Sequence, residues 1–477
     1  MVVCVLAAIV AGAGLVRCHL IGSKSLSLAE AGAVKAARGT WGGVFFAPRP
    51  GDPDPPLHVA ALRLWLRGSA SDARARGLSA AASTATLVLL YALARLLLPR
   101  WAALVVTGLS AVSACQVSHA QQARPPALAA LLVVAGWYVL TELVAGRRLE
   151  RWPLWLALAV CNLAALYTSA ATLLAVLAQL LALLLVWREV GRKLVVPWLV
   201  WQLVPLAGFA FYVPVFLERL PAAGGGASAG ACLWATARLG AGVLPDLAER
   251  LGTAGGVTGI ASVVLAVVVG LAGGRRCWAA VAIGLAWLAL PLAGAAALPP
   301  ALRAQVCEPG QVAYAAPALG LLVAAGLVGL RGKLKAIPIL IAVAMVWLNA
   351  ASLRRYYRPS VQREPWHLAG EWMKGHVVPG DMVCLNPGCL RAPFDRGYRG
   401  PAILRREVPA TGSPLWPGDL GLERRTWVVT RRGRGPAANP ALDEALRRYP
   451  LLIEQRFPGL RASIELRLFD TRRVPSD

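Results

Sequence analysis

The sequence has little charge for its length. Only 15% of its 477 residues are charged, whereas 57% are hydrophobic and the mean hydropathy is +0.58. A soluble domain carries about 25% charged residues, so this chain lacks the polar surface of a water-soluble protein. Acids are scarce as well: 24 Asp and Glu stand against 49 Lys and Arg. The basic residues occur in short groups between apolar runs, which indicates a membrane protein and no nucleic-acid partner.

Paired CxxC motifs are absent, which argues against a zinc site. Two cysteine pairs stay open as disulfides in an oxidising compartment, Cys384 with Cys389 and Cys232 with Cys307. The few acids show no metal-ligand spacing. We therefore predict no metal ligands and name no certain cofactor, although a divalent cation stays open.

The chain contains many long apolar runs. About eleven of them approach the roughly 20 residues that cross the hydrocarbon of a bilayer, and all must be helical because lipid offers the backbone no hydrogen-bond partner. We take the first run as a retained span and not a signal peptide, because it lacks a positive n-region and a clear cleavage site. The runs are 2–16, 79–98, 101–118, 126–145, 153–168, 170–187, 196–216, 256–273, 277–298, 312–330 and 336–352. Only Thr168 and Ser169 separate the fifth from the sixth, which predicts a tight hairpin.

Basic residues mark every second connection between the runs. The connections near residues 95–100, 147–151, 188–193, 275–276 and 331–335 are all basic. The positive-inside rule places them in the cytoplasm. We therefore expect a multi-pass protein of the cell inner membrane with a cytoplasmic N-terminus. The loops 17–78 and 217–256 and the C-terminal part then lie outside.

The two parts of the chain differ in pattern. Residues 1–353 are expected to form the helical membrane domain. In residues 354–477, GDMVCLNP, RTWVVT and ASIELRLFD read as strands, and ALDEALRRY reads as a helix capped by Asn439 and Pro440. The sequence thus predicts an α-helical polytopic membrane protein with a small extracytoplasmic α/β domain.

The first outer loop, residues 17–78, carries the best candidates for a site. Its segment SLSLAEAGAVKAARG contains Glu30, and the proline-fixed run DPDPPLHVAALRLW contains Asp54 and His58, one helical turn apart. An acid and an imidazole beside a membrane surface are typical of catalysis. Structural roles stay open for all three: a capping box with Ser27 for Glu30, a helix N-cap for Asp54 and an interfacial polar tip for His58.

Several motifs resemble those of a known family and occur in the same order. SLSLAE (25–30), DPPLH (54–58), LRLW (62–65) and RGLS (76–79) are followed by HAQQARPPAL, LYTSAATLLAVLAQ and PGQVAYAAPAL. The set resembles polytopic C-type glycosyltransferases, namely the dolichyl-phosphate-mannose–protein mannosyltransferase-like family and its bacterial aminoarabinose- and mannosyl-transferase relatives. The resemblance covers most of the chain. It implies a GT-C fold with about 11 transmembrane helices and an enzyme that uses a polyprenyl-phosphate sugar donor.

The chain departs from that pattern at its most important position. The family's catalytic Asp falls on Ala29, and Glu30 is the nearest acid, although one helical step turns a side chain by about 100°. Five other family residues are replaced: the first-loop His by Asp54, the following Tyr by His58, a Glu by Gln122, a His by Ser169 and a late Arg by Gln311. A general base is worth roughly 10²–10⁴-fold in rate, and Glu30, Asp54 and His58 are the candidates for it.

Cationic side chains would stabilise the departing phosphate. The resemblance points to Arg124, for which outward snorkelling stays open. Further phosphate candidates are Arg76, Arg63 and Lys24. Trp65 and Gln122 are candidates for substrate binding, and interfacial anchoring is the alternative for Trp65.

Three functions follow as hypotheses. The first is a membrane glycosyltransferase that passes a sugar from a polyprenyl-phosphate donor to a lipid, glycan or protein acceptor outside. The second is a catalytically silent relative that binds lipid-linked sugar or scaffolds glycan assembly, which the loss of the acid at Ala29 favours. The third is a transporter or flippase, which smooth and uncharged spans disfavour.

Overall fold

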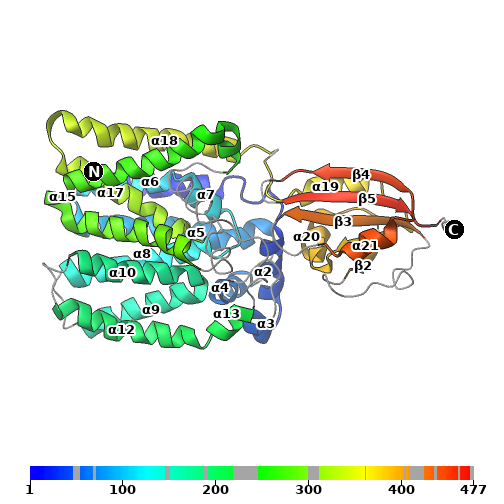
Figure 1. Ribbon diagram of the computed structural model, residues 1–477, viewed down its shortest axis with the longest axis horizontal. Coiled ribbons are helices and arrows are strands. Elements are labelled where there is room, and N and C mark those ends of the chain that lie inside the picture. The colour runs from blue at the N-terminus through cyan, green and yellow to red at the C-terminus, as the bar shows by residue number, and fades with distance from the viewer. Residues whose placement is uncertain are drawn as a thin grey trace.

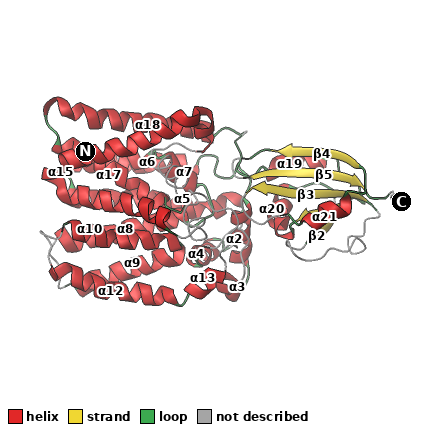
Figure 2. Ribbon diagram, in the orientation of Figure 1, coloured by secondary structure: helices red, strands yellow, loops and turns green. Residues whose placement is uncertain are grey.

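A computed structural model shows a helical body joined to a smaller sheet domain (Figure 1). The structure describes residues 1–46, 54–67, 71–145, 151–186, 192–218, 245–298, 311–359, 361–401, 403–408, 424–433, 438–459 and 462–472. Helices make up the N-terminal body and all strands lie in the C-terminal part (Figure 2). The predicted class, an α-helical body with an α/β tail, is confirmed.

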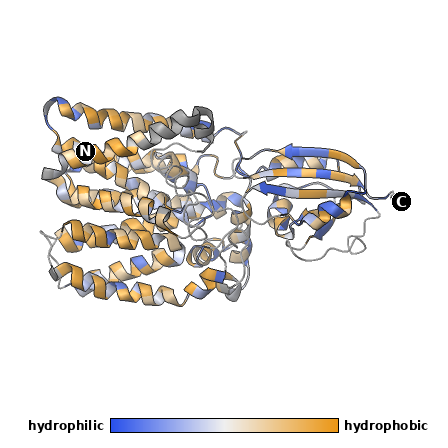
Figure 3. Cartoon of the chain, in the orientation of Figure 1, coloured by the Kyte–Doolittle hydropathy of each residue, from blue (hydrophilic) through white to orange (hydrophobic). Residues whose placement is uncertain are grey.

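Apolar helices run side by side through the body. They are α1 (Val2–Cys18), α5 (Asp72–Leu97), α6 (Arg100–Ala111), α7 (Ala114–Ala120), α8 (Pro126–Ala145), α9 (Trp152–Thr168), α10 (Leu173–Leu185), α12 (Arg192–Ala210), α15 (Pro245–Ala297), α17 (Ala316–Gly329) and α18 (Ala336–Tyr356). Hydrophobic residues cover most of their length (Figure 3). Among the described residues, four helices are long and apolar enough to cross a membrane, or five if a bent pair counts as one span, and six shorter apolar helices accompany them. The chain is a multi-pass membrane protein, and the predicted total of eleven spans stays a prediction.

Three of the predicted spans differ from separate, straight helices. The run 101–118 is broken into α6 and α7, which meet at an angle of 58°. The runs 256–273 and 277–298 both belong to α15, which is assigned as one helix but is strongly bent. Gly270 and Gly284 both lie against the side chain of Leu322, whereas 14 residues of a straight helix would separate them by about 21 Å. The helix therefore folds back between these two glycines.

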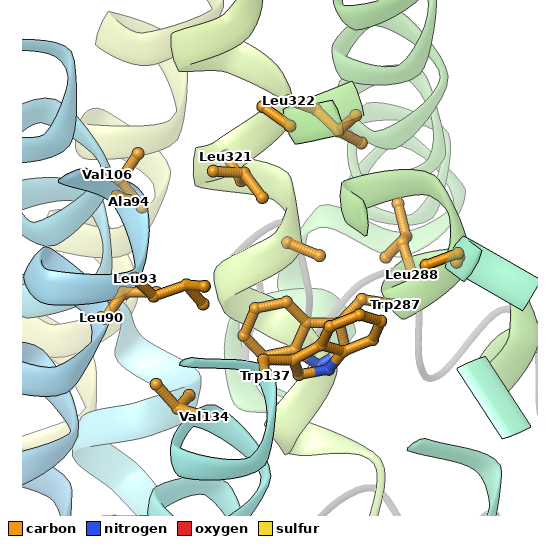
Figure 4. Close-up of a cluster of buried hydrophobic side chains, with 14 of the residues drawn as sticks. Leu90, Leu93, Ala94, Val106, Val134, Trp137, Trp287, Leu288, Leu321 and Leu322 are labelled. Carbon is orange, nitrogen blue, oxygen red and sulfur yellow. The ribbon is translucent and has the colours of Figure 1, made fainter. Parts of the chain in front are cut away.

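Large apolar side chains fill the centre of the body. Trp137 of α8 packs against Trp287 of α15 with ring centroids 5.6 Å apart. Leu90 and Leu93 of α5 and Leu322 of α17 belong to the same buried cluster (Figure 4). Close packing of this kind holds membrane helices together, because lipid provides no hydrophobic drive for their association.

A cluster of buried amide side chains also lies inside the bundle. Asn162 of α9 donates to Gln179 of α10 at 2.9 Å and to Gln202 of α12 at 2.8 Å, and Gln179 donates back to Asn162 at 3.1 Å. A Cβ on Gly136 of α8 would lie only 3.0 Å from the Asn162 oxygen. The bonds between α9 and α10, with extended backbone at Ser169 (φ −154°, ψ 126°), confirm the predicted hairpin.

The described parts of the first loop form short helices between the body and the sheet domain (Figure 1). They are α2 (Leu28–Arg38), α3 (Trp41–Phe46) and α4 (Leu57–Trp65). A short helix, α13 (Val213–Glu218), follows α12. Leu26, Val34, Val59 and Leu62 are buried in one cluster, so α2 and α4 share a small core of their own.

The tail forms a five-stranded mixed sheet. Its strands are β1 (Met382–Asn386), β2 (Leu404–Glu407), β3 (Arg425–Gly433), β4 (Leu451–Phe457) and β5 (Ala462–Asp470), in the order β2-β1-β3-β5-β4. β1 pairs in parallel with β2 and β3, whereas β5 pairs antiparallel with β3 and β4. Its helices are α19 (Trp366–Lys374), α20 (Arg391–Gly397) and α21 (Pro440–Leu446). The three predicted strands and the helix are confirmed, including the Asn439 cap, which accepts the N–H of Ala441.

The boundary between the two domains, placed near residue 353, stays a prediction. α18 continues to Tyr356, and Leu28 of the first loop lies in the same buried cluster as Trp366 and Leu390 of the tail. Cys384 and Cys389 are free thiols. Cys232 and Cys307 lie outside the described residues.

Candidate functional site

Glu30 caps its own helix at the start of α2. The Ser27 Oγ accepts the N–H of Glu30 at 3.4 Å, and Glu30 Oε2 accepts the N–H of Ser27 at 2.9 Å. Arg76 of α5 donates to both carboxylate oxygens, at 2.9 and 3.3 Å. The N–H of Ala123 donates to Oε1 at 3.0 Å. The capping box is therefore confirmed, and an ion pair reinforces it.

These contacts keep Glu30 ionised. Burial raises the pKa of its carboxyl, but the nearby Arg76 guanidinium and the hydrogen bonds outweigh burial and lower the pKa to about 2. Arg76 also donates to the carbonyls of Ile21, Lys24 and Ser25, at 2.9, 2.8 and 2.9 Å. A carboxylate bound this way would have to break its ion pair to accept a proton near neutral pH. The contacts suit a structural role better than that of a base.

Asp54 has different partners. It is 2% exposed, and Gln311 donates from Nε2 to both of its oxygens, each at 2.9 Å. Ser169 in turn donates to Gln311 Oε1 at 2.5 Å. Arg124 Nη2 lies 4.0 Å from Asp54 Oδ2. α4 begins after Pro56 without a side-chain cap, so the interpretation of Asp54 as its N-cap was wrong.

Three residues that the sequence analysis marked as departures from the motifs the chain resembles lie together. Asp54 comes from the first loop, Ser169 from the turn between α9 and α10, and Gln311 from the segment just before η2 (Ala313–Ala315). Each is a position where the sequence departs from the family pattern. The structure shows that these departures form one hydrogen-bonded chain that ends on a carboxylate.

The two carboxylates are joined through adjacent residues. The N–H of Ala123 binds Glu30, and the side chain of the next residue, Arg124, faces Asp54. The Arg124 carbonyl accepts a bond from the Ser79 hydroxyl of α5 at 3.4 Å. The short link between α7 and α8 therefore sets the positions of both acids relative to each other.

Two further candidates are buried as well. His58 lies in the first turn of α4 and is fully buried. Gln122 turns back onto α7, where its amide donates to the Ser118 carbonyl at 2.8 Å and contacts His119 Nδ1 at 2.9 Å. Their catalytic and substrate-binding roles stay predictions.

The remaining candidates make contacts elsewhere in the loop. Arg63 donates to the carbonyls of Ala37 (3.2 Å) and Gly39 at the end of α2 and lies over the ring of Trp41. Trp65 donates to the Arg74 carbonyl at 2.9 Å. The Lys24 ammonium donates to the Tyr356 carbonyl and lies 3.6 Å from the centroid of the Tyr356 ring. These contacts do not involve Asp54, so the roles of these residues also stay predictions.

The tail domain holds the first loop through Glu364. Its Oε2 accepts the N–H of Leu28 at 2.8 Å and the indole N–H of Trp366 at 3.0 Å. Its Oε1 accepts two bonds from Arg431 of β3, at 3.1 and 2.8 Å. The start of α2 is thus bound by two Glu–Arg pairs, one from the helical body and one from the tail.

Sequence reasoning did not assign site roles to Gln311, Ser169 or Glu364. The first two were visible as departures from the family motifs, and their chemical match to Asp54 (amide and hydroxyl donors) was the available signal. Glu364 carried no motif that could have marked it. Among the described residues, no group of three or more His, Cys, Asp or Glu is arranged to hold a metal ion.

Comparison with known proteins gives a result only at the level of structure. No family model and no curated protein sequence matches this chain. The chain is similar to ArnT from Cupriavidus metallidurans with bound undecaprenyl phosphate, at 14% identity over 96% of this chain and 97% of that one, with a TM-score of 0.55. The apo form of that ArnT gives a TM-score of 0.56 at the same identity and coverage. The apo oligosaccharyltransferase of Archaeoglobus fulgidus, at 10% identity, gives 0.52 over 89% of this chain and 69% of that one.

These likenesses show the fold. The chain has the GT-C-type fold that the ordered sequence motifs imply, with a small C-terminal sheet domain. The low identities leave the residues of the site to be argued from their own geometry.

Proposed function

We propose that this protein is a membrane glycosyltransferase that takes a sugar from a polyprenyl-phosphate donor. The observation that carries the proposal is the buried set of Asp54, Arg124, Gln311 and Ser169, built by segments far apart in the sequence of a GT-C-type fold. The similar ArnT structure contains undecaprenyl phosphate. A lipid phosphate of this kind is the proposed leaving group here.

The chemistry needs a base and a cation at one place. As an acceptor hydroxyl or amine attacks the anomeric carbon, its proton passes to the Asp54 carboxylate. The bond between that carbon and the phosphate oxygen breaks, and its electron pair stays on the phosphate. Arg124 faces the same carboxylate at 4.0 Å and would stabilise the negative charge of the departing phosphate.

Ser169 and Gln311 would orient Asp54 for this step. Gln311 binds both carboxylate oxygens, which fixes the plane of the carboxylate, and Ser169 fixes the amide. Glu30 would hold the loop together instead of taking part in proton transfer. Its ion pair with Arg76 and its helix-capping contacts support this division of roles.

The charge pattern of the short connections supports a location for the reaction. Basic connections on one side place the first loop and the tail on the outer face of a bacterial inner membrane. The acceptor would be a lipid, glycan or protein group at that face.

A test uses the purified protein in vesicles with undecaprenyl-phosphate sugars. Transfer of the sugar to an added acceptor supports the proposal. Failure of the protein both to bind the donor and to transfer the sugar would refute it.

A second function is favoured by Ala29, which stands where the family has its catalytic Asp, and by the ion-paired state of Glu30. A catalytically silent protein that binds lipid-linked sugar would keep the fold and Arg124. It would bind the donor in the same assay with no transfer in the wild type, and its binding would be unchanged by Asp54→Asn.

A further inference from the structure

Arg17 is a fully buried cation that the proposed reaction does not use. It lies at the end of α1 and is 0% exposed. Its Nε donates to the Ser83 hydroxyl at 2.8 Å, and its Nη1 and Nη2 donate to the carbonyls of Ala13 (3.2 Å), Ala111 (3.1 Å) and Ser110 (3.4 Å). No carboxylate pairs with it in the part of the chain that the structure describes. A buried, ionisable side chain in a membrane protein calls for an explanation.

The acceptors of Arg17 explain its position. Ser110 and Ala111 end α6, where the chain turns by 58° into α7. The last carbonyls of a helix have no partner within that helix, and lipid offers no water in their place. Arginine brings five N–H donors to such a break.

The same helix ends also compensate the buried positive charge of Arg17. The C-terminal ends of α1 and α6 both meet the guanidinium of Arg17. Each helix end carries a partial negative charge of about half an elementary charge. Two such ends supply the compensation that a carboxylate would otherwise provide.

The side chain of Gln121 binds the end of α1 in return. Gln121, which follows α7, donates from Nε2 to the carbonyls of Arg17 at 3.1 Å and His19 at 2.6 Å. The α6 end is thus bound from α1, where the Ser110 carbonyl also accepts the N–H of Ser113 at 3.3 Å, and the α1 end is bound by the residue that follows α7. One residue, Gln122, separates Gln121 from Ala123 and Arg124, which contact the two site carboxylates.

We propose that Arg17 and Gln121 form a reciprocal clamp that fixes the direction of α7 and thereby places Arg124 for the donor phosphate. Arg17 is a positioning residue, since its own donors go to Ser83 and to backbone carbonyls. The role of Arg124 in this statement rests on the proposed function. The clamp itself rests only on the contacts of α1, α6 and α7.

The test compares Arg17→Met with Arg95→Met. Arg95 is a matched control because it also donates to a carbonyl at a helix end, that of Leu98 at 3.0 Å, but at the far end of α5. Hydrogen exchange of the amides in residues 114–124 reports the clamp, and binding of undecaprenyl phosphate to the full-length protein reports Arg124. We expect Arg17→Met to speed exchange and weaken binding, each by roughly 10-fold or more, which is the size expected for lost bonds to a charged donor. Arg95→Met should change neither.

Two further variants keep the test decisive. Gln121→Met leaves the buried cation in place and should still speed exchange in residues 114–124, so it serves if Arg17→Met does not fold. Arg17→Lys, which keeps the charge and some donors, should restore part of the binding. Exchange equal in Arg17→Met and Arg95→Met would overturn the clamp, and faster exchange with unchanged binding would overturn the placement of Arg124. If the wild type does not bind undecaprenyl phosphate, the proposed function is contradicted. The hydrogen-exchange rates of residues 114–124 would still test the clamp.

Discussion

Glu30 and Asp54 are both buried carboxylates of the loop 17–78, yet their surroundings differ. Glu30 accepts bonds from a guanidinium and from backbone N–H groups of two segments. Asp54 accepts two bonds from a neutral amide and faces a guanidinium 4.0 Å away. Proton transfer to Glu30 would break a close ion pair with two hydrogen bonds, whereas transfer to Asp54 would weaken a longer ion pair, of 4.0 Å, with Arg124. The difference teaches that the partners of a buried acid decide its role more than its burial does.

The largest expected effect is on catalysis at Asp54. Asp54→Asn keeps the shape and removes the base, so turnover should fall by about 10²–10⁴-fold while undecaprenyl phosphate still binds. Asp72→Asn is the control, since Asp72 pairs with Arg396 of the tail and should leave the rate within a few-fold. Sugar transfer by purified proteins measures both, and a wild-type rate for Asp54→Asn would remove the distinction between the two acids.

The largest expected effect on stability is at Arg76. Arg76→Met leaves Glu30 buried without its cation, which costs about 3–5 kcal/mol in the free energy of unfolding. Denaturation in detergent measures the change, and Arg67→Met, at an exposed arginine, is the control. A loss below about 1 kcal/mol would mean that the pair behaves like a surface ion pair.

Acid should weaken the fold through Glu30. Its pKa is lowered to about 2 in the folded protein from 4.5. A lowered pKa gives stability that is complete above pH 4.5 and is lost as the pH falls through about 2, on the order of 3 kcal/mol in all. Unfolding measured from pH 6 to pH 2 should show this loss in the wild type and little of it in Glu30→Gln/Arg76→Met. Equal slopes in the two proteins would contradict the assignment.

A moderate effect is expected at Gln311. Gln311→Leu removes both amide bonds to Asp54, and bonds to a charged group are worth about 1.5–3 kcal/mol. Turnover should fall by about 10- to 100-fold with less change in donor affinity. Gln311→Glu would place a second acid beside Asp54 and should lower the rate as well. An unchanged rate in Gln311→Leu would mean that Asp54 does not depend on this contact.

The smallest effect is expected far from both acids. Asn162→Leu removes the centre of the amide cluster inside the bundle, and such bonds in membranes average about 0.6 kcal/mol. Thermal unfolding should shift slightly and turnover should stay at the wild-type level. A large loss of turnover would show that the site depends on the bundle interior as well as on the loop.

Local patterns of the sequence predicted the fold and the capping box of Glu30. Ser27 and Glu30 stand three residues apart, which is the spacing of a capping box, and apolar runs mark the helices. The break between α6 and α7 lies inside an apolar run, and Arg17, which binds the carbonyls at that break, is 93 and 94 residues away from them in the sequence. Such a contact leaves no local signal.

The same limit applies to the site. Asp54 and Gln311 are 257 residues apart, and no periodicity links them. The resemblance did identify Asp54, Ser169 and Gln311 as departures from the family pattern. Only the structure shows that the three residues contact one another.

The most direct measurement is the single-turnover rate of sugar transfer at saturating donor, compared between Glu30→Gln/Arg76→Met and Asp54→Asn. Replacing both members of a buried ion pair with neutral residues is often tolerated. We predict that the double variant keeps the chemical rate within about 10-fold of the wild type, whereas Asp54→Asn loses about 10²–10⁴-fold. Loss of the chemical step in a folded, donor-binding double variant, with the rate retained in Asp54→Asn, would contradict the assignment of Asp54 as the base.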